Sequence, residues 1–138
     1  MAGVGLGQIG GSIAAGLKKQ GLASRVIGLT RRSETAQRAL NLKLVDEAGT
    51  DLKRVDHADV VILATPMRTL LGQIPEIGRR LGPETLLTDV GSTKEELIQA
   101  VRKAKLRASV IAGHPMAGSE KTGLDGARAD LFTDRPWI

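Results

Sequence analysis

The sequence of 138 residues contains no cysteine and no tyrosine, and it has one phenylalanine and one tryptophan. Without cysteine, neither a disulfide framework nor a thiolate metal site can form. The near absence of aromatic side chains removes the platform on which proteins stack single-stranded nucleic acid. The net charge of +5 therefore does not predict a nucleic-acid partner. We interpret the basic cluster at 102–107 as a solvated helix face.

Long hydrophobic runs and a leader segment are also lacking. No apolar run approaches the roughly 18 residues of a membrane-spanning helix. Nothing before Gly3 resembles a signal or transit peptide. No histidine or acidic residues have the spacing of metal ligands. We therefore expect a cytoplasmic protein with no membrane partner and no metal.

The composition that remains is that of one folded domain, with 41% hydrophobic and 25% charged residues. Apolar runs of strand length alternate with longer amphipathic segments. We predict strands at 2–4, 26–29, 60–64, 85–90, 109–112 and 136–138, and helices at 9–17, 33–40, 67–81 and 94–106. The run 59–64 is apolar on both faces, as in a parallel sheet that helices cover on both sides. The sequence thus predicts an α/β fold with one doubly wound, mostly parallel sheet, in a single domain over residues 1–138.

The predicted helix 67–81 is the least regular of the four, because it contains Gly72, Pro75 and Gly78. Proline removes one backbone hydrogen bond of a helix. We therefore expect two short helices or a kink here, with Pro75 at the start of the second piece.

A glycine-rich loop follows the first predicted strand and opens the first predicted helix. It fits the pattern G-x-G-x-x-G, which in this context binds the pyrophosphate of a dinucleotide at the positive end of the helix. The pattern refines the predicted fold to the Rossmann type. The alternative interpretation is a glycine-rich turn without a ligand. The predicted cofactor-binding residues of the loop are Gly5, Leu6, Gly7, Gln8, Ile9 and Gly10.

The second predicted strand ends at Thr30, Arg31 and Arg32, where an NAD-binding protein usually has an acidic residue. A hydroxyl followed by two guanidinium groups suits the 2′-phosphate of NADP, since arginine binds phosphate oxygens bidentately. We therefore predict NADP as the cofactor in preference to NAD. The alternative is that the two arginines are solvent-facing charges before a helix capped by Ser33.

Two further strand ends carry candidate residues. Thr65 and Pro66 follow a central strand and are placed to line the cofactor crevice, although turn formation explains them equally well. Asp89 ends the next strand, at the edge where ligands bind. An aspartate at that position also commonly holds a loop through hydrogen bonds to the backbone.

The second half of the chain carries motifs that resemble a known family. They are T-D-V-G-S-T-K at 88–94, G-H-P-M-A-G-S-E-K-T-G at 113–123 and A-D-L-F at 129–132. Together with the glycine loop, and in this order, they resemble the nucleotide-binding domain of the prephenate and arogenate dehydrogenases of tyrosine biosynthesis. The resemblance covers nearly the whole chain.

The resemblance implies an oxidative decarboxylation of a small cyclohexadienol substrate, which loses a hydride to the nicotinamide and its carboxylate as carbon dioxide. It further implies that His114 accepts a hydrogen bond from the ring hydroxyl and helps to remove its proton. Free histidine is mostly neutral at pH 7 and above, as this role requires. Ser92 would orient the same hydroxyl, and Ser119 and Glu120 would line the substrate entrance.

Each proposed catalytic residue also has a purely structural interpretation. His114 follows a predicted strand, where histidine commonly packs or caps. Ser92 could cap the helix that begins near Lys94, with Glu95 as its capping-box partner. A capping role and a catalytic role of Ser92 are compatible.

The family also has a second, helical domain, which forms a homodimer and supplies an arginine for the substrate carboxylate. This chain lacks that domain, so the alternative function is a module that binds NADP without turnover. A third interpretation is another reductase of the same fold, which would use a lysine or aspartate in place of His114.

Overall fold

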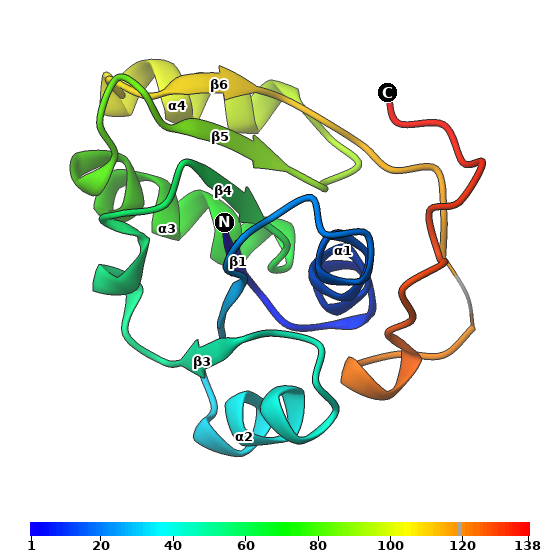
Figure 1. Cartoon of the computed structure of the whole chain (residues 1–138). Helices are drawn as coiled ribbons and strands as arrows, with labels where there is room; N and C mark the ends of the chain where they lie inside the picture. Colours follow the sequence, from blue (N-terminus) through cyan, green and yellow to red (C-terminus); the bar gives the residue numbers. More distant parts are fainter. Residues whose placement is uncertain (119) are drawn as a thin grey trace.

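The computed structural model describes residues 1–118 and 120–138, and its centre is one sheet of six parallel strands. The order of the strands across the sheet is β3-β2-β1-β4-β5-β6 (Figure 1). The strands are β1 (Ala2–Val4), β2 (Ile27–Leu29), β3 (Glu47–Gly49), β4 (Val60–Leu63), β5 (Leu86–Asp89) and β6 (Ser109–Ile111). The helices are α1 (Gln8–Lys19), α2 (Ser33–Asn41), α3 (Met67–Arg80) and α4 (Glu95–Ala104), with two 3₁₀ turns, η1 (Leu52–Val55) and η2 (Leu124–Gly126). The order of strands is that of the Rossmann fold, which confirms the predicted fold class.

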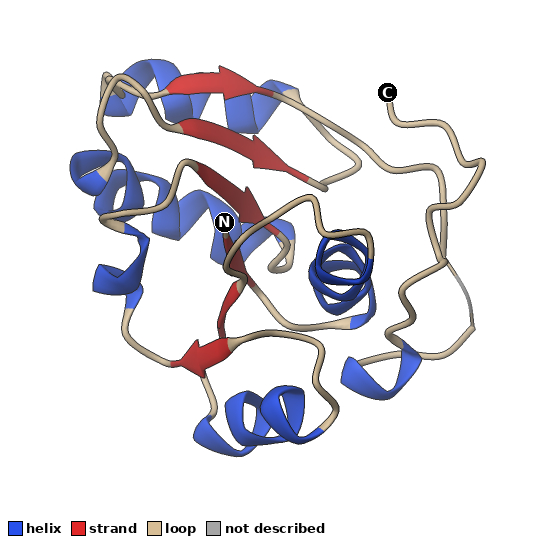
Figure 2. Cartoon of the chain, in the orientation of Figure 1, coloured by secondary structure: helices blue, strands red, loops and turns tan. Residues whose placement is uncertain are grey.

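Helices cover the sheet on both faces, so the strands have two hydrophobic cores (Figure 2). The larger core joins β1, β4 and β5 to α3 and α4, and its members include Val4, Leu63 and Ile74. The smaller core joins α1, α2 and η2, through side chains such as Ala14, Ala39 and Leu124. None of the helices in the described residues is long and apolar enough to cross a membrane.

Small residues let α1 and its loop lie close to the sheet. Gly3 and Gly28 pair with each other across β1 and β2. A Cβ atom on Gly28 would come within 2.8 Å of the Leu6 side chain, which packs in the smaller core. The absence of a side chain on Gly28 therefore lets Leu6, and the loop that carries it, lie against the strands.

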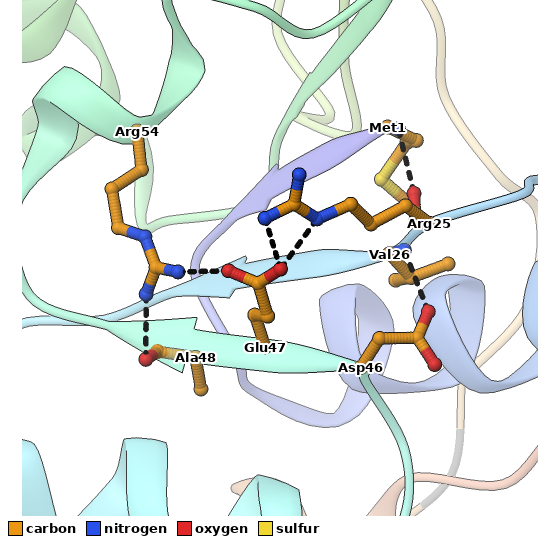
Figure 3. A network of polar contacts seen from close by, with 7 residues as sticks. All are labelled: Met1, Arg25, Val26, Asp46, Glu47, Ala48 and Arg54. Atoms are coloured by element: carbon orange, nitrogen blue, oxygen red, sulfur yellow. Dashed lines mark hydrogen bonds and ion pairs between the residues drawn. The ribbon is translucent and has the colours of Figure 1, made fainter.

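Strand β3 was absent from the predicted elements, because its sequence Glu-Ala-Gly has no apolar run. It pairs in parallel with β2 at the edge of the sheet. Glu47 accepts hydrogen bonds from both Arg25 and Arg54, and the Arg54 Nη1 donates to the carbonyl of Ala48 at 2.9 Å (Figure 3). These side chains hold β3 against β2, and Arg54 supplies a hydrogen-bond donor to a carbonyl of this edge strand.

Of the two alternatives for 67–81, two short helices are wrong, because α3 is a single helix with Pro75 inside it, and a kink at Pro75 stays a prediction. The side chains of Leu70, Ile74 and Ile77 are fully buried in the larger core. Their burial on one face, before and after the proline, stabilises the helix against the loss of one hydrogen bond.

The prediction of a last strand at 136–138 is also wrong. Residues 136–138 form no strand of the sheet, and Trp137 makes an isolated antiparallel bridge with Pro115. The segment 122–131 packs along α1, where the backbone N–H of Arg128 donates to the buried Ser12 Oγ at 2.9 Å. We call residues 122–131 the strap, and it runs beside α1 in orange to red in Figure 1.

Candidate functional site

The carboxyl ends of the parallel strands meet at one edge of the sheet, and a cleft of about 990 Å³ opens there. It lies where the strand order reverses between β1 and β4, which is the usual ligand site of this fold. Eight of the predicted cofactor residues line it. These are Gly5, Leu6, Gly7, Thr30, Arg31, Arg32, Thr65 and Pro66, whereas the predicted Gln8, Ile9 and Gly10 lie outside the lining.

The three glycines of the loop have three different surroundings. Gly5 has a φ of +103°, and a Cβ there would lie 2.6 Å from the backbone of Ala64, so the turn requires glycine. A Cβ on Gly10 would overlap the carbonyl oxygen of Gly5 and lie 2.9 Å from the Ala64 Cβ. A Cβ on Gly7 would meet nothing within 4 Å, because Gly7 borders the open cleft.

The beginning of α1 supplies hydrogen-bond donors at the same place. The N-cap of α1 is Gly7, and no side chain among the described residues caps the helix. The first N–H groups of a helix lack partners within the helix, and they carry its positive partial charge. An uncapped helix end beside an open glycine is the arrangement that accepts a pyrophosphate, so the residues present fit a dinucleotide.

Arg31 and Arg32 lie in the wall of the cleft, with exposed side chains. In the described part of the chain, neither guanidinium has a hydrogen-bond or ion-pair partner, whereas Arg38, which also lines the cleft, is paired with Asp125. The expected cap by Ser33 is wrong, because Ser33 is the first residue of α2 and Arg32 is its N-cap.

Helix α2 brings two charged residues into the cleft that the sequence reasoning missed. Glu34 and Arg38 both line it, together with Thr35. Their spacing of four residues places Glu34 and Arg38 on one face of a helix, and this spacing was the available signal. The cleft wall therefore contains a carboxylate next to the arginines.

Thr65 and Pro66 serve the cleft and the start of α3 together. Both line the cleft, and the Thr65 Oγ1 donates to the Gln73 Oε1 at 2.9 Å. Pro66 is the N-cap residue of α3. Both residues therefore line the cleft, and a role of the pair in holding the cofactor stays a prediction.

Asp89 connects the ends of β5 and β6. Its side chain is only 1% exposed and accepts from the N–H of Gly91 at 2.8 Å and of Gly113 at 3.1 Å. The Lys94 Nζ donates to the Asp89 Oδ2 at 2.5 Å and also to the Gly113 carbonyl. Asp89 therefore holds the loops, as one of the two interpretations predicted, and it fixes the backbone immediately before His114.

The half-buried His114 is held from two directions. Its backbone exchanges hydrogen bonds with Ile138, at 2.6 Å and 3.0 Å. Its Nδ1 lies 3.4 Å from the carbonyl oxygen of Val90. In the tautomer with a proton on Nδ1, this nitrogen donates to Val90 and Nε2 keeps a free lone pair. Such an imidazole can accept a proton from a hydroxyl at Nε2.

Ser92 is exposed and follows β5 at the same edge of the sheet. The expected capping role is wrong, because α4 begins at Glu95 with Lys94 as its N-cap and no side chain caps it. Neither Ser92 nor His114 lines the 990 Å³ cleft. Glu120 is exposed, and Ser119 lies outside the described residues.

Comparison with known proteins agrees with this geometry. The family described as "Prephenate dehydrogenase, nucleotide-binding domain" matches residues 13–138. The prephenate dehydrogenase of Bacillus subtilis (strain 168) is 39% identical over 137 residues, which are 97% of this chain and 37% of that protein. Synechocystis arogenate dehydrogenase superposes with a TM-score of 0.90 at 35% identity, covering 99% of this chain and 48% of that chain.

A further solved structure contains ligands. It is prephenate dehydrogenase from A. aeolicus in complex with hydroxyphenyl propionate and NAD+, with a TM-score of 0.87 and 28% identity over 97% of this chain and 47% of that chain. The chain thus spans 37% to 48% of the length of these relatives. Since the family match extends from within α1 to the last residue, this chain belongs to the prephenate dehydrogenase nucleotide-binding domain family.

Proposed function

We propose that this chain is the nucleotide-binding part of a dehydrogenase that oxidatively decarboxylates prephenate or arogenate with NADP. The observation that carries the proposal is the loop of Gly5, Gly7 and Gly10 at the start of α1, in the same cleft as Arg31 and Arg32, two arginines without a partner among the described residues. The relatives act on small molecules of this class, according to their names. A cytoplasmic location follows from this biosynthetic role.

The chain's own groups would hold the cofactor along the cleft. The N–H groups at the start of α1 would bind the pyrophosphate, and Gly7 lets it approach. Thr65 and Pro66 would border the path toward the nicotinamide. When bound, the nicotinamide supplies the acceptor for the hydride that leaves the hydroxyl-bearing carbon of the substrate.

Arg31 and Arg32 favour NADP, because a 2′-phosphate would give their guanidinium groups the partners that they lack. Glu34 lies in the same wall and favours NAD, since a carboxylate binds the ribose 2′-hydroxyl and repels a phosphate. NAD is therefore the second candidate, and NAD+ is the cofactor in the A. aeolicus structure. The cleft lining holds three arginines, Arg31, Arg32 and Arg38, against the two carboxylates of Glu34 and Asp125, so its net charge favours the phosphate.

His114 would take the hydroxyl proton of the substrate at Nε2, while Val90 holds Nδ1. The carbon then loses its hydride, the bond to the carboxylate breaks, and its electron pair enters the ring, which becomes aromatic. Ser92 would orient the hydroxyl from the neighbouring loop. We place Glu120 at the substrate entrance, together with Ser119.

We also propose that residues 1–138 form one domain of the whole protein, and that a helical domain completes the substrate site and a homodimer. Without such cover, positioning of the substrate and exclusion of water would be poor. A module that binds NADP without turnover is therefore the alternative for the isolated chain. Binding of the cofactor tests the chain directly, because it needs no substrate.

The test is calorimetric titration of the chain with NADP and with NAD. We expect tighter binding of NADP, and about tenfold weaker NADP binding in Arg31→Gln with NAD binding unchanged. Arg102→Gln, an exposed arginine of α4, is the control with the same change of charge. Equal or tighter binding of NAD by the parent chain would overturn the NADP assignment, and loss of NAD binding in Glu34→Gln would then establish the second candidate.

A further inference from the structure

An ion pair spans the cofactor cleft between two distant parts of the chain. The Arg38 Nη2 lies 2.6 Å from the Asp125 Oδ1. Arg38 belongs to α2 and Asp125 to η2 in the strap, and both residues line the 990 Å³ cleft. We propose that Arg38 is a third ligand of the 2′-phosphate and that Asp125 competes with the phosphate for Arg38, which sets the discrimination between NADP and NAD. The proposal rests on the NADP site proposed above.

Arg38 lies on the wall that carries the other candidate phosphate ligands. The cleft is lined in turn by Thr30, Arg31 and Arg32 and then by the α2 residues Glu34, Thr35 and Arg38. Arg38 follows Glu34 by four residues, so it occupies the same helix face one turn further on. A phosphate bound at the beginning of α2 would therefore have guanidinium groups on the loop and on the helix.

The strap is anchored independently of the ion pair. Leu124 is buried in the smaller core with Ala39, and the Ser12 Oγ accepts from the N–H of Arg128 at 2.9 Å. Gly11 allows the close approach, because a Cβ there would lie 2.9 Å from the Ala127 Cβ. Asp125 is thus presented to the cleft by a fixed backbone, and its carboxylate can be removed without undocking the strap.

The ion pair itself is easily exchanged. The side chains of Arg38 and Asp125 are 59% and 67% exposed, and exposed ion pairs contribute little to stability. A phosphate carries more charge than a carboxylate and can accept from several guanidinium groups, so it competes well for Arg38. The carboxylate also repels the phosphate. Asp125 therefore lowers the affinity for a 2′-phosphate and leaves the affinity for a 2′-hydroxyl unchanged.

The test compares 2′,5′-ADP with 5′-AMP, which differ only in the 2′-phosphate, by calorimetric titration. We expect about tenfold weaker binding of 2′,5′-ADP in Arg38→Gln and severalfold tighter binding in Asp125→Asn, with 5′-AMP unaffected in both. In the double variant, the gain from Asp125→Asn should become smaller, because the competition needs Arg38 and only the direct repulsion by the carboxylate remains to be removed. Asp130→Asn is the matched control, since it breaks the exposed ion pair of Arg128, which lies outside this cleft.

The outcomes separate the two proposals. If the parent chain binds both nucleotides equally, the proposed NADP site is overturned, and the proposed role of Arg38 and Asp125 is overturned with it. If the parent prefers 2′,5′-ADP but Arg38→Gln keeps that preference, only the role of Arg38 is overturned. An equal gain from Asp125→Asn with and without Arg38 overturns the competition and leaves a general field effect. Thermal unfolding of each variant shows that the fold is retained.

Discussion

The glycine loop and His114 lie at the same edge of one parallel sheet, yet their surroundings differ. The loop borders a cleft of about 990 Å³ whose walls come from β1, β2, the segment that follows β4, α2 and the strap. His114 lies outside that cleft, and the residues predicted to act with it, Ser92 and Glu120, are exposed. The part of this edge around the loop, which we call the nucleotide end, therefore has walls supplied by this chain. The part around His114, which we call the His114 end, is held in position by hydrogen bonds and carries exposed residues. Binding of a nucleotide and the placement of His114 are separable properties of the chain.

Two substitutions in the glycine loop should impair the nucleotide end in different ways, one through stability and the other through nucleotide binding. Gly10→Ala places a methyl group against the Gly5 carbonyl and the Ala64 side chain, so we expect a loss of about 3 kcal/mol in the free energy of unfolding. Gly7→Ala meets no protein atom within 4 Å and extends into the cleft. We expect it to retain stability and to lose nucleotide binding. Urea unfolding and calorimetry measure the two effects, and equal stability of the two variants would contradict this account.

Lys94→Met should destabilise the His114 end and leave the nucleotide end unchanged. It removes the cation that contacts the buried Asp89 carboxylate and the Gly113 carbonyl. We expect a loss of about 2 kcal/mol in the free energy of unfolding, with NADP binding like that of the parent because Lys94 does not line the cleft. Lys103→Met, on the exposed face of α4, is the control. Weaker NADP binding in Lys94→Met alone would show that the two ends are coupled.

The smallest expected effect concerns the opposite edge of the sheet, before β3. The hydrogen bonds from Lys18 and from the N–H of Val26 hold the pKa of Asp46 below its ordinary value of 3.8. A lowered pKa gives stability that is present above pH 3.8 and is lost as the pH falls further. We expect Asp46→Asn to cost less than about 1 kcal/mol at pH 7, since the pair is partly exposed.

The difference in the free energy of unfolding between the parent and Asp46→Asn should disappear in acid, where the parent carboxylate is protonated. Nucleotide binding at pH 7 should be the same in both. Urea unfolding of the parent and Asp46→Asn between pH 2 and 7 measures the difference. Asp59→Asn, an exposed carboxylate outside the network, is the control. A gap that persists unchanged at the lowest pH would mean that the charge of Asp46 is not what stabilises β3.

Elements formed by local sequence signals were predicted well. Apolar runs marked β1, β4 and β5, and the glycine pattern marked the nucleotide end, because both reflect interactions within a few residues. Elements formed by distant contacts were not predictable in the same way. Strand β3 depends on Arg25 and Arg54 for its side-chain contacts, and α3 stays whole across Pro75 because of its buried face.

The residues of the candidate site also fall into those predictable from local sequence and those placed by distant contacts. Arg31 and Arg32 follow a strand directly, so the sequence placed them in the cleft. Asp125 enters the cleft only because the strap folds back over α1, and no local pattern indicates this. Glu34 and Arg38 could have been predicted, since their spacing of four residues in a predicted helix is a local pattern. The roles of His114 and Ser92 stay predictions.

The hydrogen bond between Ser12 and Arg128 sets an order of events during synthesis. It joins residues separated by 116 positions, so the first helix and the sheet can assemble while the Ser12 hydroxyl still has no strap residue to bind. Contacts between residues so far apart in the sequence slow folding, because closing the loop between them costs entropy. The nascent chain therefore carries an unfinished nucleotide cleft until residues 122–128 have emerged, and a nucleotide present at that moment would bind preferentially to the completed fold.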